Sequence, residues 1–288
     1  MNRWLIGARP RTLPAAVVPV ALGAAAAVGE PGSVWWRVAP ALVVSLALQV
    51  GVNYANDYSD GVRGTDAVRV GPTRLVAGGL ASPGAVKRAA LLSFGVAAVA
   101  GLLLASVTSW WLLAVGAAAL LAGWGYTGGP KPYGYLGLGE VFVFTFFGLV
   151  ATAGTAYVVC QRVTAVAWLG GGAAGCLACA LLVVNNLRDI PTDREVGKRT
   201  LAVRVGDERT RWFYVGLLAT AMVLLVAIGV GGRPAAAIGL VGVVVAAPAV
   251  RAVSRGAKGG ELIPVLGVTA KVQLVTGLLA ALGIALSA

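Results

Sequence analysis

The chain has 288 residues, of which 58% are hydrophobic and only 12% charged, and its mean hydropathy is +0.85. A soluble domain of this length usually carries about 25% charged residues, so the composition excludes an ordinary soluble protein and indicates an integral membrane protein. The net charge of +12 comes from basic residues between apolar stretches, which favours the positive-inside pattern of membrane proteins over nucleic-acid binding.

Nine apolar segments follow one another along the chain, and each has about the 20 residues that cross a bilayer. The first contains Pro14 and Pro19 and leads into further spans, so we expect a transmembrane helix there and not a cleaved signal peptide. The predicted spans are 12–29, 37–55, 89–107, 109–127, 136–159, 164–187, 212–230, 234–252 and 262–286.

The distribution of basic residues predicts the orientation of these spans. Nine spans put the two termini on opposite sides of the membrane. With a cytoplasmic N-terminus, nineteen Lys and Arg residues fall in cytoplasmic segments and three in outer loops. We therefore expect a multi-pass protein of the plasma membrane with its N-terminus in the cytoplasm.

Two segments on the predicted cytoplasmic side combine acids, bases and glycines, and we expect them as loops over about 56–88 and 188–211. The chain that leads into them reads VNYANDYSDGVRGTDAVRVG (52–71) and VNNLRDIPTDREVGKRTLAVRVG (184–206), and each stretch starts at the cytoplasmic end of a predicted span. Their likeness suggests that spans 1–4 and 5–8 are a weak internal repeat, with span 9 extra, within one domain over 1–288.

The acids of these segments are spaced as a helix would bring them together. Asp57 and Asp60 share one face, as do Asp189 and Asp193, and like charges so placed repel unless cations neutralise them. The chain has no histidine, so a metal would be held mainly by oxygen, which favours Mg²⁺. Carboxylates from two facing segments could hold two such ions.

Basic and amide side chains in or beside the same segments point to a diphosphate as well as a metal. Arg and Lys pair with phosphate oxygens that the metals do not neutralise. The candidate diphosphate-binding residues are Asn53, Asn56, Arg63, Arg74, Lys131, Arg188, Lys198 and Arg199.

A diphosphate-binding site at the bilayer edge, with an apolar cavity beneath it, would fit an isoprenyl diphosphate. Loss of its diphosphate leaves an allylic cation, which aromatic faces stabilise. The candidates for this cavity or for a second substrate are Arg9, Tyr54, Trp124, Tyr126, Glu140, Phe144, Phe147, Asn185 and Lys271. Ordinary helix packing or an aromatic belt at the membrane interface is the alternative for the aromatic residues, and snorkelling to the interface is the alternative for Lys271.

Taken together, these residues resemble the UbiA superfamily of intramembrane prenyltransferases, and within it the MenA type that acts on 1,4-dihydroxy-2-naphthoate. The resemblance covers nearly the whole chain. It is carried by GARPRTLPAAVVPV (7–20), NDYSDGVRGTDAVRVGPTRLV (56–76), YTGGPKPYGYLGLGEVFVF (126–144) and NNLRDIPTDREVGKRTLAVRVG (185–206).

The resemblance implies an all-α bundle of nine transmembrane helices around a central cavity, capped by the two Asp-rich loops. It implies Mg²⁺ held by Asp57, Asp60, Asp66, Asp189 and Asp193, and a polyprenyl diphosphate donor. The implied reaction attaches the prenyl group to 1,4-dihydroxy-2-naphthoate with loss of CO₂ and diphosphate, giving demethylmenaquinone. Asp66 follows Asp60 by six residues where the superfamily usually has four, which weakens its assignment as a direct ligand.

Three other functions remain open from the sequence. A prenyltransferase of this type could use another acceptor, such as 4-hydroxybenzoate, homogentisate or a sugar phosphate. An ion-coupled secondary transporter also carries acids within its membrane domain, although here the acids cluster beside phosphate-binding bases at the cytoplasmic edge. A structural assembly protein leaves the acid clusters without an explanation.

Overall fold

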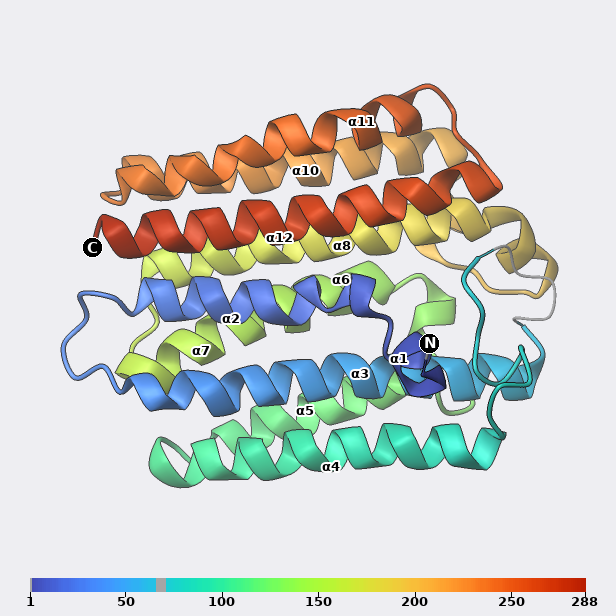
Figure 1. Ribbon diagram of the computed structural model, residues 1–288, viewed down its shortest axis with the longest axis horizontal. Helices are drawn as coiled ribbons and strands as arrows, with labels where there is room; N and C mark the ends of the chain where they lie inside the picture. Colours follow the sequence, from blue (N-terminus) through green and yellow to red (C-terminus); the bar gives the residue numbers. More distant parts are fainter. Residues whose placement is uncertain (1, 66–70) are drawn as a thin grey trace.

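The computed structural model describes residues 2–65 and 71–288, and every regular element within these ranges is helical (Figure 1). The elements are α1 (Arg3–Ala8), η1 (Pro10–Thr12), α2 (Pro14–Ala26), η2 (Trp35–Arg37), α3 (Val38–Arg63), α4 (Pro83–Val107), α5 (Leu112–Gly125), η3 (Tyr133–Leu136), α6 (Gly139–Phe144), η4 (Thr145–Val150), α7 (Ala151–Cys160), α8 (Ala165–Glu195), α9 (Leu201–Val205), α10 (Asp207–Val230), η5 (Pro234–Val241), α11 (Gly242–Ser254), η6 (Gly259–Glu261) and α12 (Leu262–Leu286).

Seven helical segments in the described ranges are long and apolar enough to cross a membrane. They are Trp35–Arg63, Pro83–Val107, Gly139–Cys160, Ala165–Glu195, Asp207–Val230, Pro234–Ser254 and Gly259–Leu286. The other two predicted spans are present as apolar helices of only 13 and 14 residues, α2 and α5. Before α2, Arg9 with φ of 51° ends α1 and the short turn η1 follows; after α2, Gly29 has φ of 83°.

The two acidic segments are more helical than the sequence predicted. We expected loops from about residues 56 and 188, but α3 continues to Arg63 and α8 to Glu195. Glycines in the left-handed conformation follow both ends: Gly64 (φ 73°) directly after α3, and Gly197 (φ 76°) two residues after α8. Four of the predicted metal ligands therefore lie on the last turns of two long helices.

Small residues bring the helices close together. An added methyl group at Gly148 would lie 2.5 Å from the Cα atom of Gly175 on α8, and one at Gly277 of α12 would lie 2.2 Å from Val18 of α2. Such close approach is typical of membrane helix bundles. Cys176 and Cys179 are free and buried in the same packing, which agrees with a structural role.

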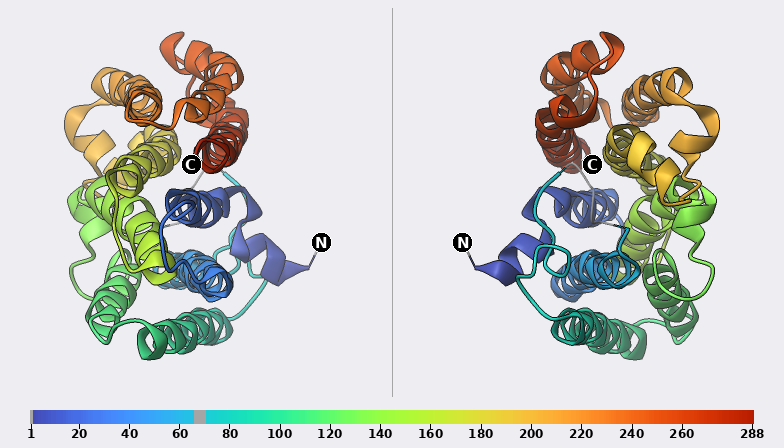
Figure 2. Two further views of the ribbon diagram at one scale, coloured as in Figure 1. Left: turned by 90° about the vertical axis from the view of Figure 1, so that its left-hand side faces the viewer. Right: turned by 90° about the vertical axis from the view of Figure 1, so that its right-hand side faces the viewer.

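The helices form one bundle in which α3 and α8 finish at the same end (Figure 1). We call this the acidic end. Views along the bundle show α2 between α12 and α3 (Figure 2), and α2 contacts both helices. The start of α2, the last turns of α3 and α8 and the start of α12 therefore all lie at the acidic end (Figure 1).

Candidate active site

A cavity of about 490 Å³ opens at the acidic end between α2, α3, α8 and α12. Residues 72–74 and the segment around Tyr126 and Tyr135 complete its wall. The predicted site residues that line it are Arg9, Asn53, Asn56, Asp60, Arg74, Tyr126, Phe147, Asn185, Arg188, Asp189, Asp193 and Lys198. The structure thus brings together acids from both segments and bases from four parts of the chain.

Asp60 lies at the centre of a buried cluster on one side of the cavity. Its Oδ1 atom accepts a hydrogen bond from the hydroxyl of Tyr135 at 2.5 Å, and its Oδ2 atom lies 3.2 Å from Nζ of Lys198. The Lys198 ammonium also lies 4.7 Å from the centre of the Tyr135 ring. Tyr135 was not predicted from the sequence, and its position in the YGYLGLGE stretch beside Lys131 was the only available signal.

These contacts set the ionisation of the Lys198–Tyr135 pair. Burial alone lowers the pKa of Lys198, but the nearby Asp60 carboxylate, together with Tyr135 and Asp193, raises it to a net value above the ordinary one. Burial, followed by the charge of Asp60, raises the pKa of Tyr135. Lys198 is therefore a cation and Tyr135 a neutral hydroxyl throughout the physiological range.

Asp189 and Arg188 form a second buried ion pair on α8. Nε and Nη2 of Arg188 donate to the two carboxylate oxygens of Asp189 at 2.6 and 2.7 Å, and Nη2 also donates to Oδ1 of Asn185 at 2.9 Å. Nη1 of Arg188 is buried and has no hydrogen-bond partner within 2–65 and 71–288. This donor is available to an anion in the cavity.

The amides around the cavity have defined partners. Nδ2 of Asn53 donates to the carbonyl of Ala8 and to the hydroxyl of Thr12, both at 2.9 Å, and Arg9 donates to the carbonyl of Asn53 at 3.3 Å. Asn56 accepts from the Thr127 hydroxyl at 2.8 Å. Asn53 and Asn56 therefore also hold neighbouring segments against α3.

Nine predicted site residues lie outside the walls of this cavity: Asp57, Arg63, Lys131, Arg199, Tyr54, Trp124, Glu140, Phe144 and Lys271. Arg63 donates to the carbonyls of Thr127 and Gly129, so it holds the loop after α5. Lys131, Arg199 and Lys271 are exposed on the surface. Asp66 lies outside the described residues.

Glu140 and the three aromatic residues outside the cavity are packed within the bundle. One carboxyl oxygen of Glu140 accepts from Asn186 at 2.9 Å, which places Glu140 behind the cavity wall. Tyr54 donates to the carbonyl of Trp4 at 2.8 Å, Trp124 stacks on Tyr58, and Phe144 packs against α8. These contacts of the three aromatic residues are those of ordinary helix packing.

The acids that line the cavity fit a magnesium site completed by a substrate. No group of three or more Asp, Glu, Cys or His side chains converges in the described part of the chain. Mg²⁺ usually takes one or two protein carboxylates and fills its shell with phosphate oxygens and water, so a converging triad is not required. Asp60 on α3 and Asp189 and Asp193 on α8 supply hard oxygen donors on the walls of one cavity.

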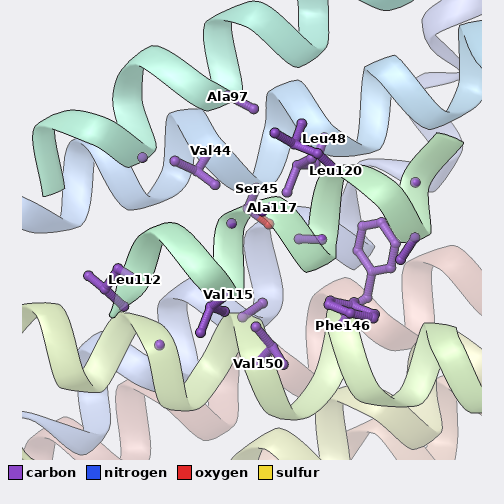
Figure 3. Close-up of a pocket in the computed structure, with 18 of the residues that line it drawn as sticks. Val44, Ser45, Leu48, Ala97, Leu112, Val115, Ala117, Leu120, Phe146 and Val150 are labelled. Carbon is purple, nitrogen blue, oxygen red and sulfur yellow. The ribbon is translucent and has the colours of Figure 1, made fainter. Parts of the chain in front are cut away.

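A second, apolar cavity of about 350 Å³ lies deeper between α3, α4, α5 and the α6–α7 segment. Figure 3 shows Val44, Leu48, Leu120, Phe146 and Val150 around it. The hydroxyl of Ser45, which also lines it, donates to the carbonyl of Ala16. The side chains around this space are therefore almost wholly hydrocarbon.

The two cavities share a stretch of wall. Val52, Tyr126, Val143 and Phe147 line both. Of the predicted aromatic residues, Tyr126 and Phe147 lie at this junction, whereas Tyr133, Phe142 and Phe146 line the apolar cavity without having been predicted. Phe147 lies on the π-helical turn η4, a feature that is often found at functional sites.

Comparison with known proteins agrees with this geometry. A model of the UbiA prenyltransferase family matches residues 16–261. The 1,4-dihydroxy-2-naphthoate octaprenyltransferase of Mycobacterium tuberculosis is 52% identical over 276 residues, which cover 96% of this chain and 94% of the relative. The Escherichia coli protein of that name is 36% identical, over 77% of this chain and 74% of the relative.

Solved structures with the same fold have much lower identity. A UbiA homolog from Archaeoglobus fulgidus has a TM-score of 0.68 at 15% identity, covering 99% of this chain and 98% of that chain. A UbiA homolog from the same organism bound to DMAPP and Mg²⁺ has a TM-score of 0.64 at 15% identity, covering 97% and 99%. The resemblance inferred from the sequence is thus confirmed, and the chain belongs to the UbiA prenyltransferase family.

Proposed function

We propose that this protein transfers a polyprenyl group from its diphosphate to 1,4-dihydroxy-2-naphthoate, in a Mg²⁺-dependent reaction that releases diphosphate and CO₂ and yields demethylmenaquinone. The observation that carries the proposal is the joining of a charged cavity to an apolar one through the wall formed by Val52, Tyr126, Val143 and Phe147. A charged head and a hydrocarbon tail are the two parts of a prenyl diphosphate. The names of the M. tuberculosis and E. coli relatives support the naphthoate acceptor.

The head of the donor would bind at the acidic end. Asp60, Asp189 and Asp193 would hold Mg²⁺, as two ions, and Arg74, Arg188 and Lys198 would contact the diphosphate. Bound Mg²⁺ would supply positive charge to the leaving diphosphate. The A. fulgidus homolog bound to DMAPP and Mg²⁺ supports this use of the fold.

Binding would exchange ion-pair partners in the site. Before binding, Lys198 neutralises Asp60 and Arg188 neutralises Asp189. Metal ions would replace these cations at the carboxylates, and the cations would turn to the diphosphate oxygens. The buried site then contains paired charges in both states, which avoids the large cost of an isolated buried charge.

The prenyl chain would lie in the apolar cavity of Figure 3, with its allylic carbon at the junction. The rings of Tyr126 and Phe147 lie there and would stabilise the allylic cation that forms when the carbon–oxygen bond breaks. The low polarity of this space also keeps water from the cation. Arg9 and Asn185 border the same cavity and would help to hold the acceptor.

In the membrane, the seven long apolar segments of the described ranges would cross the bilayer together with the shorter helices α2 and α5, giving nine spans. The acidic end would face the cytoplasm, as the basic residues predict. Trp110 and Trp111 are 64% and 82% exposed in the connection between α4 and α5 at the opposite end. Exposed tryptophans at that position are typical of a membrane interface.

Acids on α3 and on α8 at the same end suit a single domain in which spans 1–4 and 5–8 repeat and span 9 is extra.

The test is incubation of the detergent-solubilised protein with radiolabelled octaprenyl diphosphate and 1,4-dihydroxy-2-naphthoate, with and without Mg²⁺, beside Asp189→Ala. We expect a Mg²⁺-dependent prenylated product that the variant does not form. Turnover only with 4-hydroxybenzoate or homogentisate would refute the acceptor and retain the prenyl transfer. Absence of turnover with every acceptor would refute the whole proposal.

A further inference from the structure

Asp57 differs from the other acids of the two segments in the direction of its side chain. Asp60, Asp189 and Asp193 line the charged cavity, whereas Asp57 does not, and it is only 1% exposed. It lies on α3 one turn before Asp60. Its carboxyl group therefore lies on a different side of α3 from that of Asp60.

The carboxyl group of Asp57 binds the backbone of the segment that follows α3. The amide N–H of Leu75 lies 3.1 Å from each of its two oxygens, and the amide N–H of Val76 donates to Oδ1 at 3.4 Å. Amides 18 and 19 residues further along the chain are thus held by one side chain. Hydrogen bonds from N–H groups to a carboxylate are stronger than those to a neutral oxygen.

Apolar packing fixes the same point of the segment. Leu75 is fully buried in a cluster with Tyr54, Ala55 and Phe94. An added methyl group at Gly7 of α1 would lie 2.5 Å from Leu75, and one at Gly61 of α3 would lie 2.4 Å from Val76. Both glycines are therefore needed for this contact, and the chain at Leu75 and Val76 has little freedom.

The residues just before this anchor form part of the charged cavity. Pro72, Thr73 and Arg74 all line it, and Arg74 adjoins the anchored Leu75. Gly71 lies over the guanidinium of Arg188, because an added methyl group there would be 3.4 Å from its Cζ atom. The anchor therefore determines where the 71–74 backbone and the Arg74 side chain lie relative to α8.

We propose that Asp57 is not a metal ligand but a positioning residue, which holds residues 75 and 76 so that Arg74 is presented to the diphosphate. The two aspartates of the first acidic motif then have different roles on different faces of α3. Asp60 faces the metal and the substrate, and Asp57 faces the backbone of the segment that carries a substrate-binding arginine. The identity of the ligand in this proposal rests on the proposed function, whereas the anchoring by Asp57 does not.

Amide hydrogen exchange tests the anchor without any substrate. In Asp57→Asn one oxygen remains to accept a hydrogen bond, and in Asp57→Ala none does. We expect the amides of Leu75 and Val76 to exchange about tenfold faster in Asp57→Asn and faster still in Asp57→Ala, with unchanged exchange in α8. Asp60→Asn is the matched control and leaves these two amides unaffected. Unchanged protection of Leu75 and Val76 in both Asp57 variants would overturn the proposal.

Thermal stabilisation by Mg²⁺ at saturating prenyl diphosphate separates anchoring from metal binding. We expect the Mg²⁺ concentration for half-maximal stabilisation to stay within about twofold of wild type in Asp57→Asn and to rise at least about tenfold in Asp60→Asn. An equal shift in the two variants would make Asp57 a metal ligand and overturn the proposal. Should wild type gain no stability from Mg²⁺ and prenyl diphosphate, the proposed function fails, and the exchange result alone decides the anchor.

A double-mutant cycle tests whether Asp57 acts through Arg74. We expect Asp57→Asn and Arg74→Ala each to weaken prenyl diphosphate binding about tenfold. The double variant is expected to bind no more weakly than Arg74→Ala alone, because the arginine that the anchor positions is then already absent. Fully additive losses would show that the two residues act independently and would overturn the proposal.

Discussion

The last turns of α3 and α8 carry the same kind of acidic pair, yet their side chains are used differently. On α8, Asp189 and Asp193 both line the charged cavity. On α3, only Asp60 does, while Asp57 binds the backbone at Leu75 and Val76. A shared sequence pattern therefore does not imply a shared role.

Helix geometry explains part of this difference. With 3.6 residues per turn, residues four apart lie about 40° from each other around the helix axis, and residues three apart lie about 60° from each other. The closer pair on α8 fits one cavity wall. The wider pair on α3 spans the boundary between the cavity and the packed segment 75–76, so its two members meet different partners.

Removal of a cavity-facing acid on either helix is expected to have the largest effect. Asp189→Asn and Asp60→Asn should each reduce kcat/KM by more than about a hundredfold, since changes to residues that only orient metal ligands already cost 10–100-fold. Initial rates at saturating Mg²⁺ measure this, with size-exclusion profiles as the control for folding. Retention of a tenth of wild-type activity in either variant would contradict the assignment.

Loss of the cation beside Asp60 should chiefly affect stability. The side chains of Lys198 and Asp60 are only 10% and 7% exposed, so Lys198→Met leaves a carboxylate buried without its cation. Breaking such a pair typically costs about 3–5 kcal/mol. We expect a clear fall in the thermal denaturation midpoint in detergent.

The double variant Asp60→Asn with Lys198→Met is the control for this pair. It removes both charges, so we expect it to recover at least half of the stability lost by Lys198→Met. A double variant less stable than Lys198→Met would mean that Lys198 supports the fold through its packing and not through Asp60.

Removal of the Tyr135 hydroxyl is expected to have a smaller effect on the cluster around Asp60. Tyr135→Phe keeps the ring beside Lys198 and Arg63 but removes the donor to Asp60. We expect a loss of about 1 kcal/mol, or roughly fivefold in kcat/KM, as for one buried hydrogen bond. Steady-state kinetics at fixed Mg²⁺ would measure it, and a change smaller than twofold would argue against a role for the hydroxyl.

Much of this site could be predicted from the sequence because its signals are local. Apolar length located the apolar segments, and acids at helical spacing located the two acidic segments, which were expected as loops and are instead the last turns of α3 and α8. What the sequence lacks is the rotation of each helix and the path of each loop. It could not show that Asp57 faces Leu75, or that Lys131 and Arg199 point to the surface while Lys198 is buried.

The contacts that the sequence did not predict have the same explanation. Tyr135 reaches Asp60 across 75 positions in the chain, and Asn186 reaches Glu140 across 46. Such contacts depend on tertiary packing, and neither tyrosine nor asparagine is unusual in a membrane protein. Glu140, which the sequence offered as a cavity residue, does not line the cavity, whereas its hydrogen-bond partner Asn186 does.

The pH dependence of stability is the smallest effect expected, and it tests the cluster of Asp60, Lys198 and Tyr135 at the end of α3. The pKa of Lys198 is raised by Asp60 despite burial, and burial and Asp60 raise that of Tyr135. A group with a raised pKa in the fold contributes stability below its unfolded pKa, about 10.4 for Lys and 10 for Tyr, and loses it above. We therefore expect no contribution of this cluster to pH dependence between about pH 6 and 9 and a decline at higher pH. The thermal midpoint of wild type should fall more steeply than that of Lys198→Met between about pH 9.5 and 11. If the thermal midpoints of the two proteins fell in parallel with pH, folding next to Asp60 would not raise the pKa of Lys198.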